Sequence, residues 1–314
     1  MLISLRKFFV LTIFPIAVFG SFLAGGTETV YAAPVLKVVT STSIYTDLVK
    51  KIGGENVEAR FVASPRFNVH FIQPKPSDVR NVARADLFVF SGLDLEAWAD
   101  PLLEAAGKPV LFRGGDRNLD LSQGIRLLEV PQGNINRSQG DIHLFGNPHY
   151  WMNPENLKMM AENVAAKLSE IDPANESLYR GNLRSFLERL DAKIAEWKNI
   201  CAHCAGKEIV SYHKDIEYLA DFLGVRVSRY IEPMPGIPPT AKHLASLENY
   251  MKQSRTRIIV KPTFYPQGAA ESVAERTGGE VRIICQNVSE KEGTGDIFAF
   301  FDTNIHELSE ALKR

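Results

Sequence analysis

Cysteine is scarce in this chain of 314 residues, which contains only Cys201, Cys204 and Cys285. Cys201 and Cys204 have the Cys-x-x-Cys spacing of a redox pair or of half a zinc site. Such a zinc site needs a second pair, which the sequence lacks. A redox pair normally opens a helix after a strand, whereas this pair follows a long amphipathic segment. We therefore expect a structural disulfide that joins Cys201 or Cys204 to Cys285 and leaves one thiol over.

An excess of either charge is also missing. The chain has 36 lysines and arginines against 37 aspartates and glutamates, which gives a formal net charge of −1. Nucleic-acid-binding proteins carry a concentrated positive surface. The balance therefore predicts that this protein has no nucleic-acid partner.

The N-terminus has an apolar run, but a short one. Residues 8–24 are almost all apolar and follow Arg6 and Lys7. The run is short for a membrane-spanning helix, and residues 30–32 supply a signal-peptidase site. We predict a signal peptide at residues 1–32, cleaved after Ala32, rather than a membrane anchor. No cysteine lies near this site, so we expect a soluble periplasmic protein without a lipid anchor.

What the rest of the chain does contain is a regular alternation of strand-like and helix-like segments. Short apolar runs predict strands at residues 36–40, 57–62, 87–90, 110–112, 208–212, 226–231, 257–260 and 281–285. Helical spacing predicts helices at residues 44–52, 76–83, 95–106, 154–171, 215–222, 241–253, 268–276 and 303–313. Residues 114–146 are polar and indicate a loop with one short strand at 125–130. Repeated β–α units predict a mostly parallel sheet covered by helices.

One predicted helix is much longer than the others. Residues 175–200 carry apolar side chains at steps of three and four residues: Leu183, Phe186, Leu187, Leu190, Ile194 and Trp197. A helix of this length spans roughly 35–40 Å. The fold class that we predict is therefore α/β, with two similar lobes joined by one long rigid helix. The expected boundaries are residues 33–172 for the first lobe, 173–204 for the linking helix and 205–314 for the second lobe.

Three of the seven histidines stand where a ligand site is expected. His70, His149 and His213 each lie at a strand-to-helix or loop-to-helix junction. Ligands of open α/β sheets bind in the crevice outside the carboxyl ends of the strands. Three imidazoles converging there would suit Zn²⁺. The remaining four histidines are interpreted as ordinary surface or helix residues: His143, His203, His243 and His306.

The residues around these histidines resemble a known family. Residues 70–78 resemble its His-x-x-x-Pro-x-Pro-Ser-Asp element, residues 148–154 its Pro-His-x-Trp-x-x-Pro element, and residues 211–213 its Ser-x-His element. A later Glu-Pro segment is similar to residues 232–239. The family comprises the periplasmic solute-binding proteins of zinc- and manganese-uptake ABC transporters, cluster A-I. The resemblance spans nearly the whole mature chain. It implies two α/β lobes bridged by a rigid helix, a transition-metal ion as cargo, and an inner-membrane permease with its ATPase as partner.

The chain departs from the family pattern at the fourth ligand. The family usually places an aspartate after a late strand, where this chain has Cys285-Gln286-Asn287. The candidates for the fourth position are Glu232, then Gln286, then water, and Glu232 is equally well interpreted as a loop-capping carboxylate. Asn147 and Asn153 also stand where aspartate is common. Three imidazoles favour Zn²⁺ over Mn²⁺, which prefers more carboxylate oxygen, and Mn²⁺ or Fe²⁺ remains the alternative.

Together these features predict a periplasmic, monomeric, non-enzymatic subunit. It would capture Zn²⁺ through His70, His149 and His213, with Glu232 as a further candidate ligand, and deliver it to the permease. A metallochaperone, an adhesin and a binder of a larger metal chelate are alternatives. A zinc hydrolase would need a general base beside the metal, and no His-Glu-x-x-His motif is present.

Overall fold

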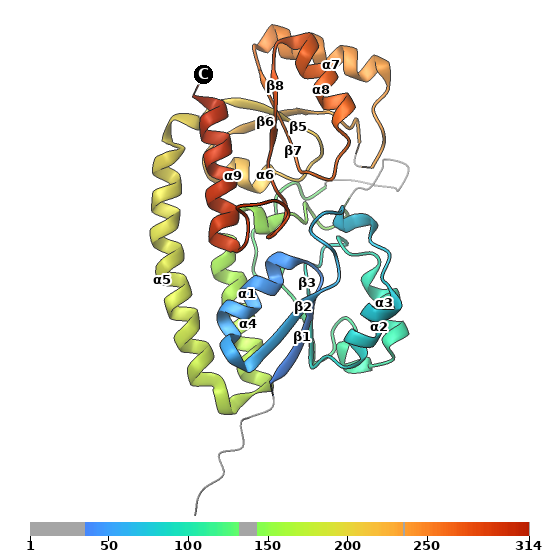
Figure 1. Cartoon of the computed structure of the whole chain (residues 1–314), viewed down its shortest axis with the longest axis vertical. Helices are drawn as coiled ribbons and strands as arrows, with labels where there is room; N and C mark the ends of the chain where they lie inside the picture. The colour runs from blue at the N-terminus through green and yellow to red at the C-terminus, as the bar shows by residue number, and fades with distance from the viewer. Residues whose placement is uncertain (1–34, 132–142, 235, 314) are drawn as a thin grey trace, which may run out of the picture. The chain divides into compact units, whose positions relative to one another are not determined.

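Each half of the chain forms a parallel sheet of four strands (Figure 1). The structure is a computed structural model, and it describes residues 35–131, 143–234 and 236–313. The first sheet has the order β2-β1-β3-β4, with strands Leu36–Thr40, Val57–Phe61, Leu87–Phe90 and Asn118–Asp120 for β1 to β4. The second has the order β6-β5-β7-β8, with strands Glu208–Ser211, Arg226–Tyr230, Ile258–Lys261 and Glu280–Ile283 for β5 to β8. The order is therefore the same in both halves, and the predicted fold class of two similar α/β lobes is confirmed.

Helices flank both sheets. They are α1 Ser43–Gly53, α2 Pro76–Ala83, α3 Ala99–Ala106, α4 Asn156–Ile171, α6 Glu217–Leu223, α7 Ala241–Ser254, α8 Gln267–Thr277 and α9 Ile297–Leu312. Their ends follow local sequence rules. Pro76 opens α2 at a position where no backbone N–H is needed. Gly278 ends α8 with φ 70°, a left-handed conformation that costs glycine little.

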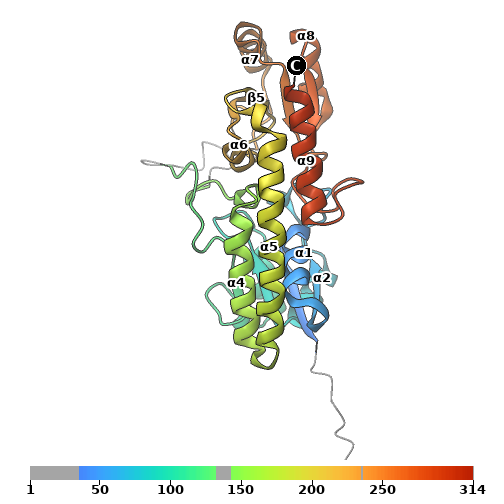
Figure 2. The ribbon, with the colours of Figure 1, turned by 90° about the vertical axis from the view of Figure 1, so that its left-hand side faces the viewer.

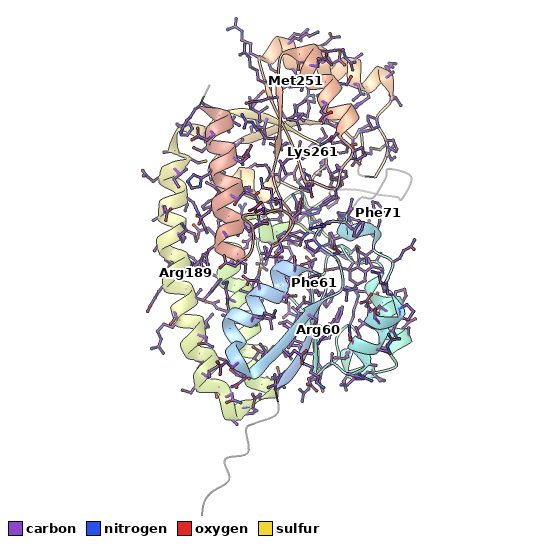
Figure 3. All side chains as sticks on the ribbon, in the orientation of Figure 1. Arg60, Phe61, Phe71, Arg189, Met251 and Lys261 are labelled. Carbon is purple, nitrogen blue, oxygen red and sulfur yellow. The ribbon has the colours of Figure 1, made fainter. Side chains whose placement is uncertain are left out.

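The long helix α5 runs from Glu176 to Ile200, a length of about 37 Å for 25 residues. It packs against α1 and α4 of the first lobe and against the C-terminal helix α9 (Figure 2). Its buried face consists of Tyr179, Phe186, Leu190, Ile194 and Trp197. The indole Nε1 of Trp197 donates to Asp302 of α9 at 2.7 Å. Arg189 extends from α5 (Figure 3), and its guanidinium lies 4.0 Å from the centre of the Phe298 ring of α9.

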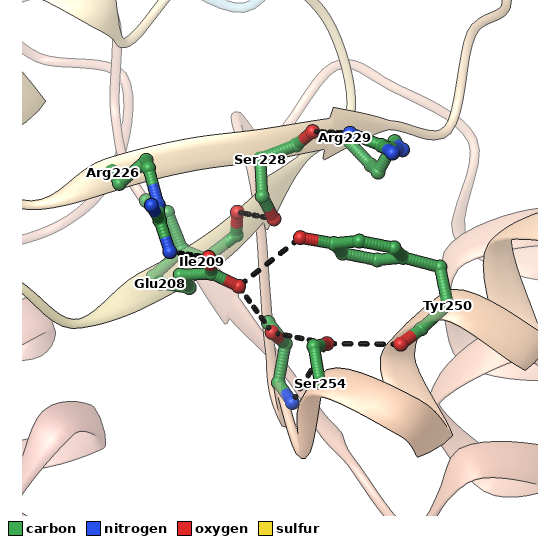
Figure 4. Close-up of polar contacts among 8 residues, drawn as sticks. Glu208, Ile209, Arg226, Ser228, Arg229, Tyr250 and Ser254 are labelled. Carbon is green, nitrogen blue, oxygen red and sulfur yellow. Dashed lines mark hydrogen bonds and ion pairs between the residues drawn. The ribbon is translucent and has the colours of Figure 1, made fainter.

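The core that supports the site is largely continuous. One apolar cluster includes buried residues of the first lobe, of α5 and of the second lobe, and a smaller cluster lies beneath α7 and α8. Polar contacts tie α7 to the second sheet (Figure 4). The carboxylate of Glu208 in β5 accepts from Tyr250 of α7 at 3.2 Å and from Thr256 at 3.1 Å. It also pairs with Arg226 of β6.

Several element predictions were wrong. Residues 110–112 are not a strand, because Pro109 opens a 3-10 turn over Pro109–Leu111, and residues 125–130 also form no strand. The fourth strand is Asn118–Asp120, whose single buried apolar residue, Leu119, leaves no pattern in the sequence. Helix α9 begins at Ile297 rather than at residue 303, because Asp296 caps it by accepting from the N–H of Ala299 at 2.8 Å.

The predicted disulfide to Cys285 was wrong, since all three cysteines are free and buried. Two of the thiols make other polar contacts. Cys201 Sγ donates to the carbonyl of Ile305 in α9 at 3.6 Å, and Cys204 Sγ lies 3.7 Å from His203 Nε2. The backbone N–H of Cys285 donates to Oδ1 of Asn304 at 2.8 Å. Burial raises the pKa of the Cys285 thiol to about 12 and also raises the pKa of the Cys201 thiol. These thiols are therefore protonated and unreactive at neutral pH.

The predicted signal peptide, residues 1–32, lies outside the described part of the chain. Within the described residues, no helix has both the length and the apolar character needed to cross a membrane.

Candidate metal site

His70 lies between β2 and α2, in the 3-10 turn Val69–Phe71. The side chain of Asn68 accepts the backbone N–H of His70 at 3.0 Å, which fixes the start of the turn. The indole of Trp98 donates to the carbonyl of Val69 at 2.7 Å. Phe71, the next residue, is largely exposed (Figure 3). The turn therefore places His70 between a buried anchor and the surface.

His149 is positioned by the same local device. The side chain of Asn147 accepts the N–H of His149 at 3.0 Å, as Asn68 does for His70. The Nδ2 of Asn147 donates to Glu129 at 3.0 Å and lies 3.3 Å from Glu217. An aspartate has no N–H to give these carboxylates, so the position that is commonly aspartate in the family is suited here to asparagine. Two Asn-x-His pairs thus orient the first two histidines.

His213 follows β5 in the second lobe and is held by a carboxylate. Its Nδ1 lies 2.8 Å from Oε2 of Glu232, which follows β6. The N–H of Glu232 donates to the carbonyl of Tyr212 at 3.0 Å, so the two loops are joined by the backbone as well. Glu232 Oε2 also accepts the N–H of Gly236 at 3.2 Å, which is the loop-capping role considered above. With Nδ1 engaged, Nε2 of His213 is the nitrogen left for a ligand.

The three histidines come together although they belong to separate loops of two lobes. His70 Nε2 and His149 Nε2 are 3.3 Å apart. One ligand nitrogen from each of His70, His149 and His213 lies within 4.8 Å of the others. His149 and His213 are only 3% and 4% exposed, so water competes little for their nitrogens. Among the described residues this is the one group of three or more potential metal ligands at such distances.

Burial disfavours a proton on His149. It lowers the pKa of His149 well below the usual histidine range, and the neighbouring His70, His213 and His143 add repulsion against a proton. A neutral imidazole has a lone pair for a metal ion. The arrangement therefore favours metal binding at neutral pH over protonation.

A fourth imidazole, which we interpreted as ordinary from the sequence, lies beside the group. The ring centre of His143 is 5.1 Å from that of His70 and 6.3 Å from that of His149. His143 precedes His149 by only six residues, and this short spacing was the available signal.

Two further polar residues adjoin the histidines. A small cavity is lined by Asn68, Val69, His70, His149, Trp151, Asp215, Phe264, Tyr265, Gln286 and Asn287. Two hydrogen bonds fix the backbone of Gln286. Its N–H donates to Glu290 at 2.6 Å, and its carbonyl accepts from Trp151 Nε1 at 2.9 Å. Burial, with added repulsion from Glu217, Glu232 and Glu290, raises the pKa of Asp215 well above its usual range. Gln286 was among the candidates expected from the sequence, whereas Asp215, two residues after His213, was not.

Comparison with known proteins agrees with this geometry. The model of the family described as "Zinc-uptake complex component A periplasmic" matches residues 38–311. The manganese ABC transporter substrate-binding lipoprotein PsaA of Streptococcus anginosus is 26% identical over 305 residues, which cover 93% of this chain and 94% of that protein.

Solved structures share the fold. A crystal structure of ZnuA superposes with a TM-score of 0.75 at 22% identity, covering 89% of this chain and 100% of that one. A mutant of the laminin-binding adhesin Lmb from Streptococcus agalactiae gives 0.73 at 23% identity, covering 88% and 100%. Because the family model spans most of the chain, this protein belongs to the ZnuA family, the extracytoplasmic metal-binding components of ABC transporters.

Proposed function

We propose that this protein captures one Zn²⁺ ion between its two lobes, through His70, His149 and His213, and delivers it to an inner-membrane permease driven by an ATPase. The observation that carries this proposal is the approach of three histidine nitrogens to within 4.8 Å of one another. Zinc takes nitrogen ligands at about 2.0–2.1 Å in a tetrahedral arrangement. Small rotations of these side chains would bring the nitrogens to an ion at their centre.

Glu232 supports this site through His213. Its Oε2 already accepts from Nδ1, and a carboxylate on the far nitrogen of a ligating histidine fixes the tautomer and strengthens the ligand. Direct ligation by Glu232 would require this carboxylate to rearrange, so the supporting role is the one that we propose.

Zinc is the ion that the donor set favours. Imidazole nitrogen suits Zn²⁺, whereas Mn²⁺ prefers carboxylate and water oxygen, and the group of three close ligands contains no carboxylate. The family description refers to zinc and the streptococcal relative is named for manganese, so Mn²⁺ and Fe²⁺ are the competitors to test.

Capture and release follow from the position of the site. His70 and His149 belong to the first lobe and His213 to the second, so a small rocking of the lobes opens the site, while the long helix limits larger motion. The lobe boundaries that we propose are residues 33–172 and 205–314, with the helix at 173–204.

We propose a monomer that acts in the periplasm. The relatives are named lipoproteins, and the absence of a lipid anchor stays a prediction.

Other functions fit less well. The small cavity beside the histidines, walled in part by Trp151, Phe264 and Tyr265, suits an ion or a water rather than a metal chelate or a hydrolase substrate. We therefore propose that the protein is not an enzyme. The adhesin named among the structural relatives shares the fold, and buried histidines such as His149 and His213 do not serve an adhesive surface.

Metal analysis after non-denaturing purification tests the proposal. Wild type is expected to retain about one Zn²⁺ per chain and the His70→Ala/His149→Ala/His213→Ala variant almost none. His306→Ala is the matched control, because His306 is exposed on α9. Equal zinc in wild type and the triple variant would show that this site is wrong. Preferential retention of Mn²⁺ or Fe²⁺ from a mixture would overturn the choice of zinc.

A further inference from the structure

The second lobe contains a buried carboxylate without a basic partner. Asp215, in the turn between β5 and α6, is only 2% exposed. Its one side-chain hydrogen bond among the described residues is a long one, 3.4 Å to the hydroxyl of Ser211. No lysine or arginine in the described part of the chain forms an ion pair with it. Buried carboxylates are normally paired, metal-linked or neutral.

Gln286 presents an unsatisfied acceptor next to Asp215. Its side-chain Nε2 donates to the backbone carbonyl of Asp215 at 3.3 Å, which fixes the direction of the amide. Its Oε1 is buried and has no hydrogen-bond partner among the described residues, although Gln286 is only 3% exposed. An unsatisfied buried acceptor costs roughly 1–3 kcal/mol. A donor from outside the chain would remove this cost.

Both acceptors line the same small cavity as His70 and His149. The loop that holds Gln286 is itself well fixed. Glu290 accepts the backbone N–H groups of Gln286 and Asn287 at 2.6 and 3.2 Å, and that of Thr263 at 2.8 Å. Two buried side chains with acceptor oxygens therefore stand at a fixed place beside two of the imidazoles: Gln286, whose Oε1 has no donor, and Asp215, which has only the long contact with Ser211.

We propose that Asp215 and Gln286 together hold the fourth coordination position of the bound ion, an inference that rests on the proposed function. A water bound to the ion donates one hydrogen to the Asp215 carboxylate and the other to Gln286 Oε1. No Asp215 oxygen belongs to the close group of three histidine nitrogens, so a link through water fits better than direct ligation. Asp215 is thus a positioning and selectivity residue.

The test compares Asp215→Asn with the matched variant Asp221→Asn, an exposed aspartate of α6 that pairs with Arg126. Zn²⁺ affinity is measured by competition with a chromophoric chelator, and the visible spectrum is recorded with Co²⁺ in place of Zn²⁺. Asp215→Asn is expected to weaken zinc binding about 10–100-fold, as other outer partners of metal ligands do, and to change the Co²⁺ bands. Asp221→Asn is expected to do neither.

Folding is followed separately in the metal-free proteins. Asparagine is nearly isosteric with aspartate and carries no buried charge, so the apo protein is expected to melt at the wild-type temperature or above it. Lower apo stability with unchanged zinc affinity and unchanged Co²⁺ bands would assign Asp215 a merely structural role and overturn the inference.

His149→Ala separates this inference from the proposed function. If His149→Ala loses zinc while Asp215→Asn binds as tightly as Asp221→Asn, the role of Asp215 is wrong and the histidine site stands. If His149→Ala also binds zinc as wild type does, the histidine site itself is wrong, and the role of Asp215 falls with it.

Discussion

At the scale of single residues, short side chains and fixed hydrogen bonds decide which imidazole nitrogen of each histidine faces the ion. Asn68 and Asn147 each accept the N–H of the histidine two residues later, at 3.0 Å in both cases. Glu232 holds Nδ1 of His213 at 2.8 Å. These contacts orient the imidazoles before an ion arrives, which lowers the entropic cost of binding.

Glu96 allows a prediction at the same scale. It is fully buried in the segment between β3 and α3, and burial raises its pKa to about 7. The unfolded chain loses this proton near pH 4.5 and the folded chain near pH 7. The contribution of Glu96 to stability is therefore fully present below about pH 4.5 and is lost as the pH rises through about 7.

Replacing Glu96 with glutamine removes this titration. The free energy of unfolding of Glu96→Gln is expected to depend less on pH between 5 and 8, and at pH 8 to exceed that of wild type by up to about 3 kcal/mol. Urea unfolding at a series of pH values measures this. Glu188→Gln, on the exposed side of α5, is the control. A Glu96→Gln slope identical to that of wild type would contradict the assigned pKa.

At the scale of elements, caps and apolar faces fix the helices, while short strands depend on their neighbours. Helix α2 runs over Pro76–Ala83, as predicted, because its starting proline is a local signal. Strand Asn118–Asp120 exists because β3 offers it a parallel partner, with Phe88 paired to Asn118. Pairing between such distant segments cannot be predicted from the local sequence.

The cap of α9 supports a prediction about stability alone. Asp296 accepts the N–H of Ala299 at 2.8 Å and pairs with Lys51 of α1 at 3.3 Å. Asp296→Ala is expected to lower the free energy of unfolding by about 1 kcal/mol and to leave zinc affinity unchanged. Urea denaturation measures the first and chelator competition the second. Asp191→Ala, an exposed aspartate of α5, should have almost no effect; an equal loss in both variants would argue against the cap.

At the scale of the whole molecule, the two lobes meet at the site. Ser43 of α1 donates to the carbonyl of Val288 at 2.7 Å, and Trp151 donates to that of Gln286 at 2.9 Å. His70 and His149 also face His213 across this junction. An ion bound there would join the lobes in the folded state only.

Zinc is therefore expected to stabilise the whole chain against unfolding. At free Zn²⁺ of about 100 times the dissociation constant, linkage adds about 2.7 kcal/mol. Thermal unfolding with added zinc, and again after removal of zinc with EDTA, should show a reversible rise in Tm. The triple histidine variant should show none. An equal rise in that variant would locate the stabilising ion elsewhere.

Features that depend on local pattern could be predicted from the amino-acid sequence. Apolar periodicity is enough to predict the long helix, and glycine and proline positions predict many element ends. The flanking motifs singled out His70, His149 and His213, which the folded chain then brings into contact. Each of these features depends on residues close together in the chain.

Only the tertiary structure decided the surroundings of those histidines. His143 and Asp215 carry no motif, and they adjoin the site because separate loops converge there. Glu232 is adjacent in sequence to none of the histidines, and parallel pairing of β5 and β6 brings it to Nδ1 of His213. Cys285 forms no disulfide for the same reason, because the residues that surround it come from α9 and β8. Contacts between distant segments arise from packing, which local sequence does not encode.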